Sequence, residues 1–265
     1  MTRLVAEWID DMEAQMISYN SELKRKTGLD LTELMEASLG LKAAYVSDAQ
    51  EKLKISVVPI TQGMGIISKF SESVAAIIRT AGFNASVTEN TDVNGMHEAI
   101  TSGADILFMA DDDRYLALNL KTGMHGDNNY CTSLGFIEVM LEMAKKQGRR
   151  IEEEDILILG YGVLGKIAES ILKDKGYEPQ IYDNNLQVNQ EVEIIDKDNI
   201  KNYSYILDFT NEGDWISTDM LKDDVIYASP GIPVSLNEEA RKLHKNNSVF
   251  DLLEIGTVVM LASVI

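Results

Sequence analysis

The segment Gly160-Tyr-Gly-Val-Leu-Gly165 has the glycine spacing of a turn that binds a dinucleotide. It follows the apolar run Ile156–Leu159 and leads into a helical pattern, and Asp183 ends the next apolar run. In such a turn the first glycine allows a tight bend, the second lets the backbone approach the pyrophosphate, and the third lets helix and strand pack closely. Asp183 would accept hydrogen bonds from the adenosine ribose and repel a 2′-phosphate, which favours NAD over NADP. The pattern predicts an NAD site with contacts from Gly160, Gly162, Val163, Leu164, Gly165 and Asp183.

Two further loops in the second half of the chain follow apolar runs. Thr210 and Asn211 come directly after Tyr205–Phe209, and the loop Ser229-Pro-Gly-Ile-Pro233 follows the next run. Ligands of open α/β sheets collect at the carboxyl ends of the strands, so Thr210, Asn211 and Pro230 are predicted cofactor contacts. Turn formation explains the first two equally well, and prolines can simply stiffen a loop.

Three consecutive aspartates, Asp111 to Asp113, follow the predicted strand Asp105–Met109. A run of charges is usually a solvated loop. A carboxylate at the end of a buried strand can instead hold an ammonium group or accept its proton. Both interpretations stay open for Asp111, which is the candidate catalytic residue.

Polar residues follow other predicted strands. Thr61 and Gln62 begin a glycine-containing loop directly after a strand, and Asp251 ends the last strand. Thr257, near the start of the predicted terminal helix at residues 256–265, is a further predicted cofactor contact. Asp251 is therefore a candidate site residue, although a capping role for that helix is an equal alternative.

The elements that must position these residues alternate along the chain. Apolar spacing predicts helices over residues 4–26 and 30–39, the second capped by Asp30 and ended by Gly40. Strands and helices then alternate, which predicts an α/β fold with a parallel sheet in the first half and a Rossmann-type, doubly wound parallel sheet in the second. We expect an N-terminal helical and α/β substrate domain over residues 1–150 and an NAD-binding domain over residues 151–265.

The composition excludes several classes of protein. The formal charge is −19, with 43 acidic and 24 basic residues, which would repel nucleic acid and anionic membranes. The single cysteine, Cys131, cannot form an intrachain disulfide or a cysteine-based zinc site, and no histidine spacing suggests a metal site. The N-terminus lacks the pattern of a signal peptide, and no stretch is long and apolar enough to span a bilayer. We expect a cytoplasmic protein without a metal, and Cys131 as a buried small residue.

Several segments together resemble the pyrrolysine synthase family, in the same order and with similar spacing over nearly the whole chain. The segments are Val58–Ile67, Asp92–Gly95, Met109–Asp112, Asn119–Lys121, Asn128–Thr132, Ser229–Pro233 and Ile255–Thr257. The resemblance implies an NAD-dependent enzyme that acts on lysine joined through its ε-nitrogen to 3-methyl-D-ornithine. It oxidises the terminal amine carbon, releases ammonia and closes the pyrroline ring by imine formation.

The resemblance also implies roles for individual residues. Asp111 matches the active-site aspartate, Asn128 and Asp251 match polar groups of the pocket, and Leu4 resembles a lid residue that closes over substrate. The loop that begins with Thr61 and Gln62 departs from the family pattern, as does the third aspartate, Asp113, so the resemblance leaves the detailed substrate contacts open.

Two other functions share these features. An NAD-dependent amino-acid dehydrogenase or imino-acid reductase would have the same dinucleotide unit, and an NAD-sensing module would bind the cofactor without turnover. The oligomeric state is expected to be a homodimer, because most soluble oligomers of this kind have two-fold symmetry.

Overall fold

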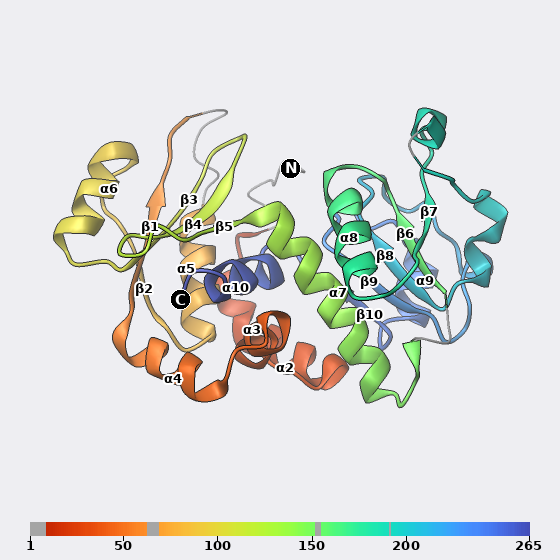
Figure 1. The fold of residues 1–265 in the computed structure, drawn as a ribbon, viewed down its shortest axis with the longest axis horizontal. Helices are drawn as coiled ribbons and strands as arrows, with labels where there is room; N and C mark the ends of the chain where they lie inside the picture. Colours follow the sequence, from red (N-terminus) through yellow and green to blue (C-terminus); the bar gives the residue numbers. More distant parts are fainter. Residues whose placement is uncertain (1–8, 63–68, 152–154, 191) are drawn as a thin grey trace. The chain divides into compact units, whose positions relative to one another are not determined.

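The computed structural model describes residues 9–62, 69–151, 155–190 and 192–265, and it divides the chain into two compact units. The first comprises residues 1–24, 29–131 and 253–265, and the second comprises residues 25–28 and 132–252. This division differs from the expected boundary at residue 150. The difference arises because the C-terminal helix α10 (Glu254–Ala262) packs against α3 (Leu31–Leu39) and α5 (Phe70–Thr80) of the first unit (Figure 1).

Three helices precede the first strand: α2 (Met12–Thr27), α3 and α4 (Ala43–Lys52). The predicted ends of α3 are confirmed, since Asp30 and Glu33 form a reciprocal capping box and Gly40 ends the helix in the left-handed conformation. The sequence did not predict α4, whose N-cap residue, Lys42, makes no side-chain capping bond. The helix predicted from residue 4 has its first part outside the described residues, and α2 begins only at Met12.

The first unit contains a mixed sheet with the order β2-β1-β3-β4-β5. Its strands are β1 (Lys54–Pro59), β2 (Asn84–Val87), β3 (Ile106–Ala110), β4 (Tyr115–Asn119) and β5 (His125–Asp127). The strands β1, β2 and β3 are parallel, as predicted. The sequence did not predict the antiparallel part of the sheet, in which β4 pairs with both β3 and β5. Short turns join these three strands, and a parallel connection would need a much longer crossover.

Helices cover both faces of this sheet. Ala99 on α6 (Asp92–Thr101) packs with Val58 and Leu107 on one face. On the other face the Phe70 ring of α5 meets the Tyr115 ring edge-on, with centroids 5.4 Å apart. The Tyr115 hydroxyl also lies 2.8 Å from Oγ1 of Thr257 on α10, so the C-terminal helix belongs to this layer.

The second unit contains a parallel sheet with the order β10-β9-β8-β6-β7. Its strands are β6 (Ile156–Leu159), β7 (Gln180–Tyr182), β8 (Tyr205–Asp208), β9 (Ile226–Ser229) and β10 (Ser248–Phe250). The chain enters the sheet at β6, moves outward to β7 and then continues on the other side from β8 to β10. The predicted doubly wound parallel sheet is confirmed, and its strand order reverses between β6 and β8.

Helices pack on both faces of the second sheet as well. Gly165 of α8 (Val163–Asp174) lies against Ile158 of β6 on one face. On the other face Leu157, Leu159 and Tyr227 form a core with residues of the 3₁₀ turns and of α9 (Glu238–Leu243). The long helix α7 (Asn128–Lys146) begins in the first unit and continues into the second. A membrane-crossing helix is not found in the described part of the chain, where no helix combines the required length and apolar character.

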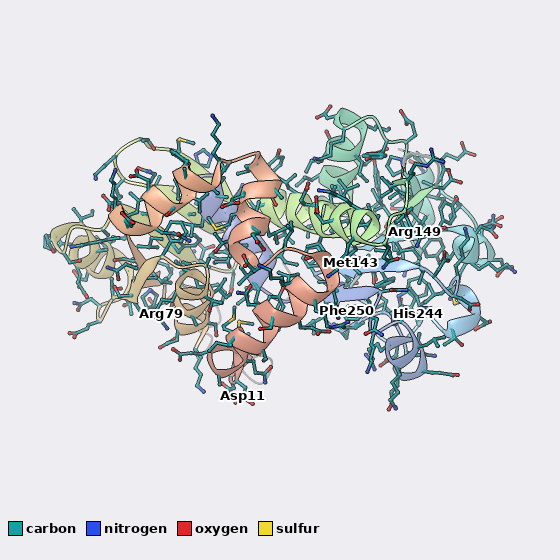
Figure 2. All side chains as sticks on the ribbon, turned by 90° about the horizontal axis from the view of Figure 1, so that it is seen from below. Asp11, Arg79, Met143, Arg149, His244 and Phe250 are labelled. Atoms are coloured by element: carbon teal, nitrogen blue, oxygen red, sulfur yellow. The ribbon has the colours of Figure 1, made fainter. Side chains whose placement is uncertain are left out.

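His244 lies at the end of α9 and is labelled in Figure 2. The residue is buried, with only 2% of its surface exposed. Neither ring nitrogen has a hydrogen-bond partner among the described residues. Burial lowers the pKa of His244, against a smaller opposing effect of Asp223. The folded protein therefore binds a proton here less readily than the unfolded chain does, and the stability of the fold must fall as the pH drops below the ordinary histidine pKa of 6.5.

Replacement of His244 by leucine is expected to remove this pH dependence. The substitution also removes a buried unpaired donor, which should raise the free energy of unfolding by about 1–2 kcal/mol at neutral pH. Urea unfolding at pH 7.5 and pH 5 would measure both effects, with the exposed His97→Leu as the matched control. The expectation would be contradicted if the free energy of unfolding fell by the same amount from pH 7.5 to pH 5 in the wild type and in His244→Leu.

Candidate functional site

The glycine turn after β6 has the geometry of a phosphate cradle. Gly160 has a φ of 86°, which disfavours other residues, and a Cβ there would lie 3.0 Å from the carbonyl carbon of Phe209. A Cβ on Gly165 would lie 2.0 Å from the Gly160 oxygen, closer than any real contact. A Cβ on Gly162 would meet no described atom within 4 Å. Two glycines therefore allow the turn to pack, while the third leaves open space in front of it.

Helix α8 begins directly at this open space. Its N-cap residue is Gly162, which has no side chain to bond the first amides of the helix. Free amides at a helix N-terminus, with the positive end of the helix dipole, bind phosphate groups. Val163 is 61% exposed beside them, and the Leu164 carbonyl accepts a hydrogen bond from Ser133 of α7. The turn and helix thus fit a pyrophosphate group.

Asp183, the residue after β7, is tied to the glycine turn. Its Oδ2 accepts a hydrogen bond from the Tyr161 amide at 2.7 Å, and its Oδ1 accepts one from the Asn185 amide at 2.8 Å. The side chain is partly exposed, so the carboxylate is both fixed and accessible. This position, beside the turn and at the carboxyl end of the neighbouring strand, is the one expected for a group that bonds the ribose.

A buried hydrogen-bond network lies at the carboxyl end of β8, and the sequence analysis missed it. Asp208 is 1% exposed, and its Oδ1 accepts from the amide and the hydroxyl of Thr210 at 2.8 and 2.7 Å. Its Oδ2 accepts from the Tyr227 hydroxyl, and the Thr210 hydroxyl lies 2.8 Å from that of Ser235. Burial raises the pKa of Asp208, although these hydrogen bonds oppose the shift. Thr210 is thus held by a buried carboxyl, whereas Asn211 is exposed.

The loop that contains Pro230 is joined to the same network. Ser229 donates to the Asp208 carbonyl at 2.8 Å, and the Gly231 amide donates to the Ser229 hydroxyl at 3.0 Å. A Cβ on Gly231 would lie 2.8 Å from the Thr210 carbonyl oxygen, so the loops after β8 and β9 pack closely. The structure therefore brings Thr210 and Pro230 together at the edge of the sheet that carries the glycine turn.

Asp251 lies at the same edge of the second sheet, after the outermost strand, β10. Its amide donates to the Ser229 carbonyl at 3.4 Å, and the residue is 6% exposed. The alternative role as the cap of the terminal helix is not found, since the N-cap residue of α10 is Leu253.

Thr61, Asp111 and Asn128 follow strands whose carboxyl ends lie at one edge of the first sheet. Pro59 of β1 pairs with Ala110 of β3, so the chain leaves both strands at the same level. The strand β5 runs parallel to β3 across β4, and its last residue, Asp127, pairs with Leu116, which in turn pairs with Met109. The sheet therefore gathers at one edge three residues that are far apart in the sequence.

Asp111 shapes the turn between β3 and β4. Its Oδ1 accepts hydrogen bonds from the amides of Asp113 and Arg114 at 2.8 and 2.7 Å, and its own amide donates to the Arg114 carbonyl. The residue is partly exposed, whereas Asp112 and Asp113 are exposed. No described group bonds Oδ2, so that oxygen can meet an amine.

Thr61 donates two hydrogen bonds to the carboxylate of Asp92, one to each oxygen. Its amide donates to Oδ1 of Asp92 at 2.8 Å, and its hydroxyl donates to Oδ2 at 2.6 Å. The hydrogen bonds from Thr61 lower the pKa of Asp92, which has an unusual positive φ of 53°. The pair links the end of β1 to the start of α6, and the neighbouring Gln62 is exposed.

Asn128 is the first residue of α7. Asp127 orders this helix start, because its Oδ1 accepts from the amides of Asn129 and Tyr130 at 3.0 and 3.4 Å. Arg114 lies 3.2 Å from Oδ2 of Asp127 and so joins the two turns that carry Asp111 and Asn128.

The remaining predicted residues are Thr257, Leu4 and Cys131. Thr257 is buried within the first unit, where its hydroxyl meets Tyr115. Leu4 lies outside the described residues. Cys131 is buried as predicted, and burial raises the pKa of its thiol to about 12, so it is no thiolate nucleophile. The described residues contain no group of three or more acidic, histidine or cysteine side chains that could hold a metal ion.

The first part of the chain matches a family model, and the whole chain aligns with two known proteins. Residues 8–125 match the family model described as pyrrolysine biosynthesis protein PylD, N-terminal domain. The pyrrolysine synthase of Methanosarcina acetivorans is 30% identical and that of Methanosarcina barkeri 31% identical, both over 100% of this chain and over 100% and 98% of their own lengths. The shikimate 5-dehydrogenase of Thermus thermophilus, solved with NADP(H) and shikimate, is similar at 12% identity and a TM-score of 0.47, over 79% of this chain and 91% of its own.

Proposed function

Since this chain belongs to the pyrrolysine synthase family, we propose that it converts L-lysine-Nε-3-methyl-D-ornithine to pyrrolysine by NAD-dependent oxidation of the terminal amine. The observation that carries the proposal is the glycine turn on a doubly wound parallel sheet, in a chain that matches two pyrrolysine synthases from end to end. The polar edge of the first sheet, with Asp111 among its members, supports an amine substrate.

The proposed reaction balances without a metal. The ammonium nitrogen first loses a proton, and the ornithine amine carbon then loses a hydride to the cofactor, which accepts two electrons when bound, leaving an iminium ion. Water adds to the iminium and ammonia leaves, which gives the semialdehyde. An amine of the same molecule then attacks the aldehyde and releases one water as the ring imine forms.

Asp111 is the proposed catalytic residue. Hydride can leave only after the amine has lost its proton, and a carboxylate beside the amine accepts that proton. Once the carboxyl group has passed the proton to water, its negative charge stabilises the cationic iminium. The Oδ1 atom of Asp111 is occupied by backbone amides, which fixes the side chain and leaves Oδ2 for this task. The proposed substrate contacts are Thr61, Gln62, Asn128 and Asp251, with Leu4 as the proposed lid residue.

The cofactor is proposed to be NAD. The cradle that a Cβ on Gly162 would fill accommodates a pyrophosphate, and the Asp183 carboxylate beside it favours a free ribose 2′-hydroxyl over a 2′-phosphate. The proposed cofactor contacts are Gly160, Gly162, Val163, Leu164, Gly165, Asp183, Thr210, Asn211, Pro230 and Thr257. Thr257 has the weakest support, because its hydroxyl is buried against Tyr115.

We also propose that the protein is a cytoplasmic homodimer in which the first unit binds the substrate and the second unit binds NAD. The buried free thiol of Cys131 suits a reducing compartment. Light scattering after size exclusion tests the dimer, and a monomer mass would contradict it.

One assay tests the activity against its alternatives. The purified protein is incubated with NAD and synthetic L-lysine-Nε-3-methyl-D-ornithine, and NADH absorbance and product mass are followed together. NADH formation with the mass of the cyclised imine is expected. Oxidation of free amino acids instead would favour an amino-acid dehydrogenase, and NAD binding without turnover would favour a sensing module.

A further inference from the structure

Glu212 lies on the loop after β8, beside the loop that carries Asp183. Its Oε2 accepts a hydrogen bond from Nδ2 of Asn184 at 3.4 Å, and Asn184 directly follows Asp183. In the sheet order, β8 and β7 are the two neighbours of β6. The contact between Asn184 and Glu212 therefore joins the loops on either side of the strand that leads into the glycine turn.

The carboxylates of Asp183 and Glu212 both affect the hydroxyl group of Tyr182. Burial raises the pKa of the Tyr182 hydroxyl, and the negative charges of Asp183 and Glu212 add to the shift. Neither Asp183 nor Glu212 forms an ion pair within the described ranges, and both are at least partly exposed. The ammonium group of Lys197 lies 5.0 Å from the centroid of the Trp215 ring. Trp215 in turn contacts Tyr182, so the Trp215 ring separates Lys197 from Tyr182.

We propose that Glu212 is a second cofactor-selectivity residue, which acts with Asp183 to exclude a nucleotide that carries a 2′-phosphate. The inference deepens the proposed NAD site and rests on it. A 2′-phosphate placed at Asp183 would bring up to two negative charges to that carboxylate and towards the Glu212 carboxylate, which is hydrogen-bonded to the next residue, Asn184. The sequence from Asp183 to Leu186 supplies no arginine or lysine at this place. A ribose 2′-hydroxyl is neutral and can donate a hydrogen bond, so NAD meets no such repulsion.

Glu212→Gln tests the proposal without breaking the loop. The glutamine amide oxygen can still accept from Asn184, so the substitution removes the charge and keeps the hydrogen bond. Glu239→Gln is the matched control, because Glu239 is an exposed carboxylate of the same unit on α9, which joins β9 to β10 at the other side of the sheet. Calorimetric titration of the full-length protein with NAD⁺ and with NADP⁺, each alone, measures the two dissociation constants.

Glu212→Gln is expected to tighten NADP⁺ binding by roughly three- to tenfold and to change NAD⁺ binding by less than about twofold. In the wild type, added salt should narrow the difference between the two affinities, because repulsion between exposed charges is screened. The role of Glu212 would be overturned if Glu212→Gln left the ratio of the NADP⁺ and NAD⁺ dissociation constants unchanged, or if Glu239→Gln changed that ratio equally. Wild-type binding of NAD⁺ would still support the cofactor site in that case. Failure of the wild type to bind either nucleotide would overturn the NAD site and this inference together.

Discussion

Replacement of Asp111 by asparagine is expected to lower kcat by about 10²- to 10⁴-fold, the usual contribution of a general base. Asparagine keeps an oxygen at the Oδ1 position, so the hydrogen bonds from the amides of Asp113 and Arg114 can persist and the turn between β3 and β4 should keep its shape. The charge at Oδ2 is lost, and with it the acceptor for the amine proton. NAD binding should be unaffected, because the glycine turn belongs to the other unit.

The control for this variant is Asp113→Asn. It removes the same charge from an exposed side chain two residues further along the chain. Its kcat should stay within about threefold of the wild-type value, since an exposed loop carboxylate contributes little. A raised pH should not restore Asp111→Asn to full activity. Similar rates for Asp111→Asn and wild type would show that another group takes the proton.

Gly162→Ala is expected to lose NAD binding, whereas Gly165→Ala is expected to lose folding stability. The new Cβ at position 162 meets no described atom within 4 Å, so the variant should fold with wild-type stability but weaken NAD binding by at least about tenfold, because the methyl group enters the pyrophosphate space. The new Cβ at position 165 would lie 2.0 Å from the Gly160 oxygen, a backbone atom that cannot move aside cheaply. That variant should lose about 2–4 kcal/mol of folding free energy.

Thermal unfolding and fluorescence titration with NAD separate the two outcomes. Each alanine variant serves as the control for the other, because the chemical change is the same and only the surroundings differ. If Gly162→Ala bound NAD as tightly as the wild type, the open space before α8 would not be the pyrophosphate site. If Gly165→Ala unfolded at the wild-type temperature, the contact with the Gly160 carbonyl would be less tight than the structure indicates.

The sequence predicted best where one residue has one physical reason to be present. Asp30 and Gly40 predicted both ends of α3, and the glycine turn predicted β6, α8 and the position of Asp183 beside the turn. These signals are local, since each concerns a cap, a positive φ or a close approach within a short stretch of chain.

The strand β4 was missed because its sequence, Tyr-Leu-Ala-Leu-Asn, lacks an alternation of apolar and polar residues, although burial alternates along it. Because apolar side chains lie on both faces of β4, the sequence shows no period of two in hydrophobicity, which is the usual signal of a strand. The Asp208 network was missed for a different reason. Its members Tyr227 and Ser235 lie 19 and 27 positions further along the chain, and only the parallel pairing of β8 and β9 brings the first of them to Asp208.

The position of α10 has a consequence for how the protein must be made. The last residues of the chain complete the layer of the first unit, and along the chain the second unit, apart from residues 25–28, comes before them. As the chain leaves the ribosome, residues 132–252 are available before the first unit has its final helix to pack under Tyr115. The second unit can therefore finish folding first, whereas the first unit, most of which is translated earlier, must wait for residues 253–265.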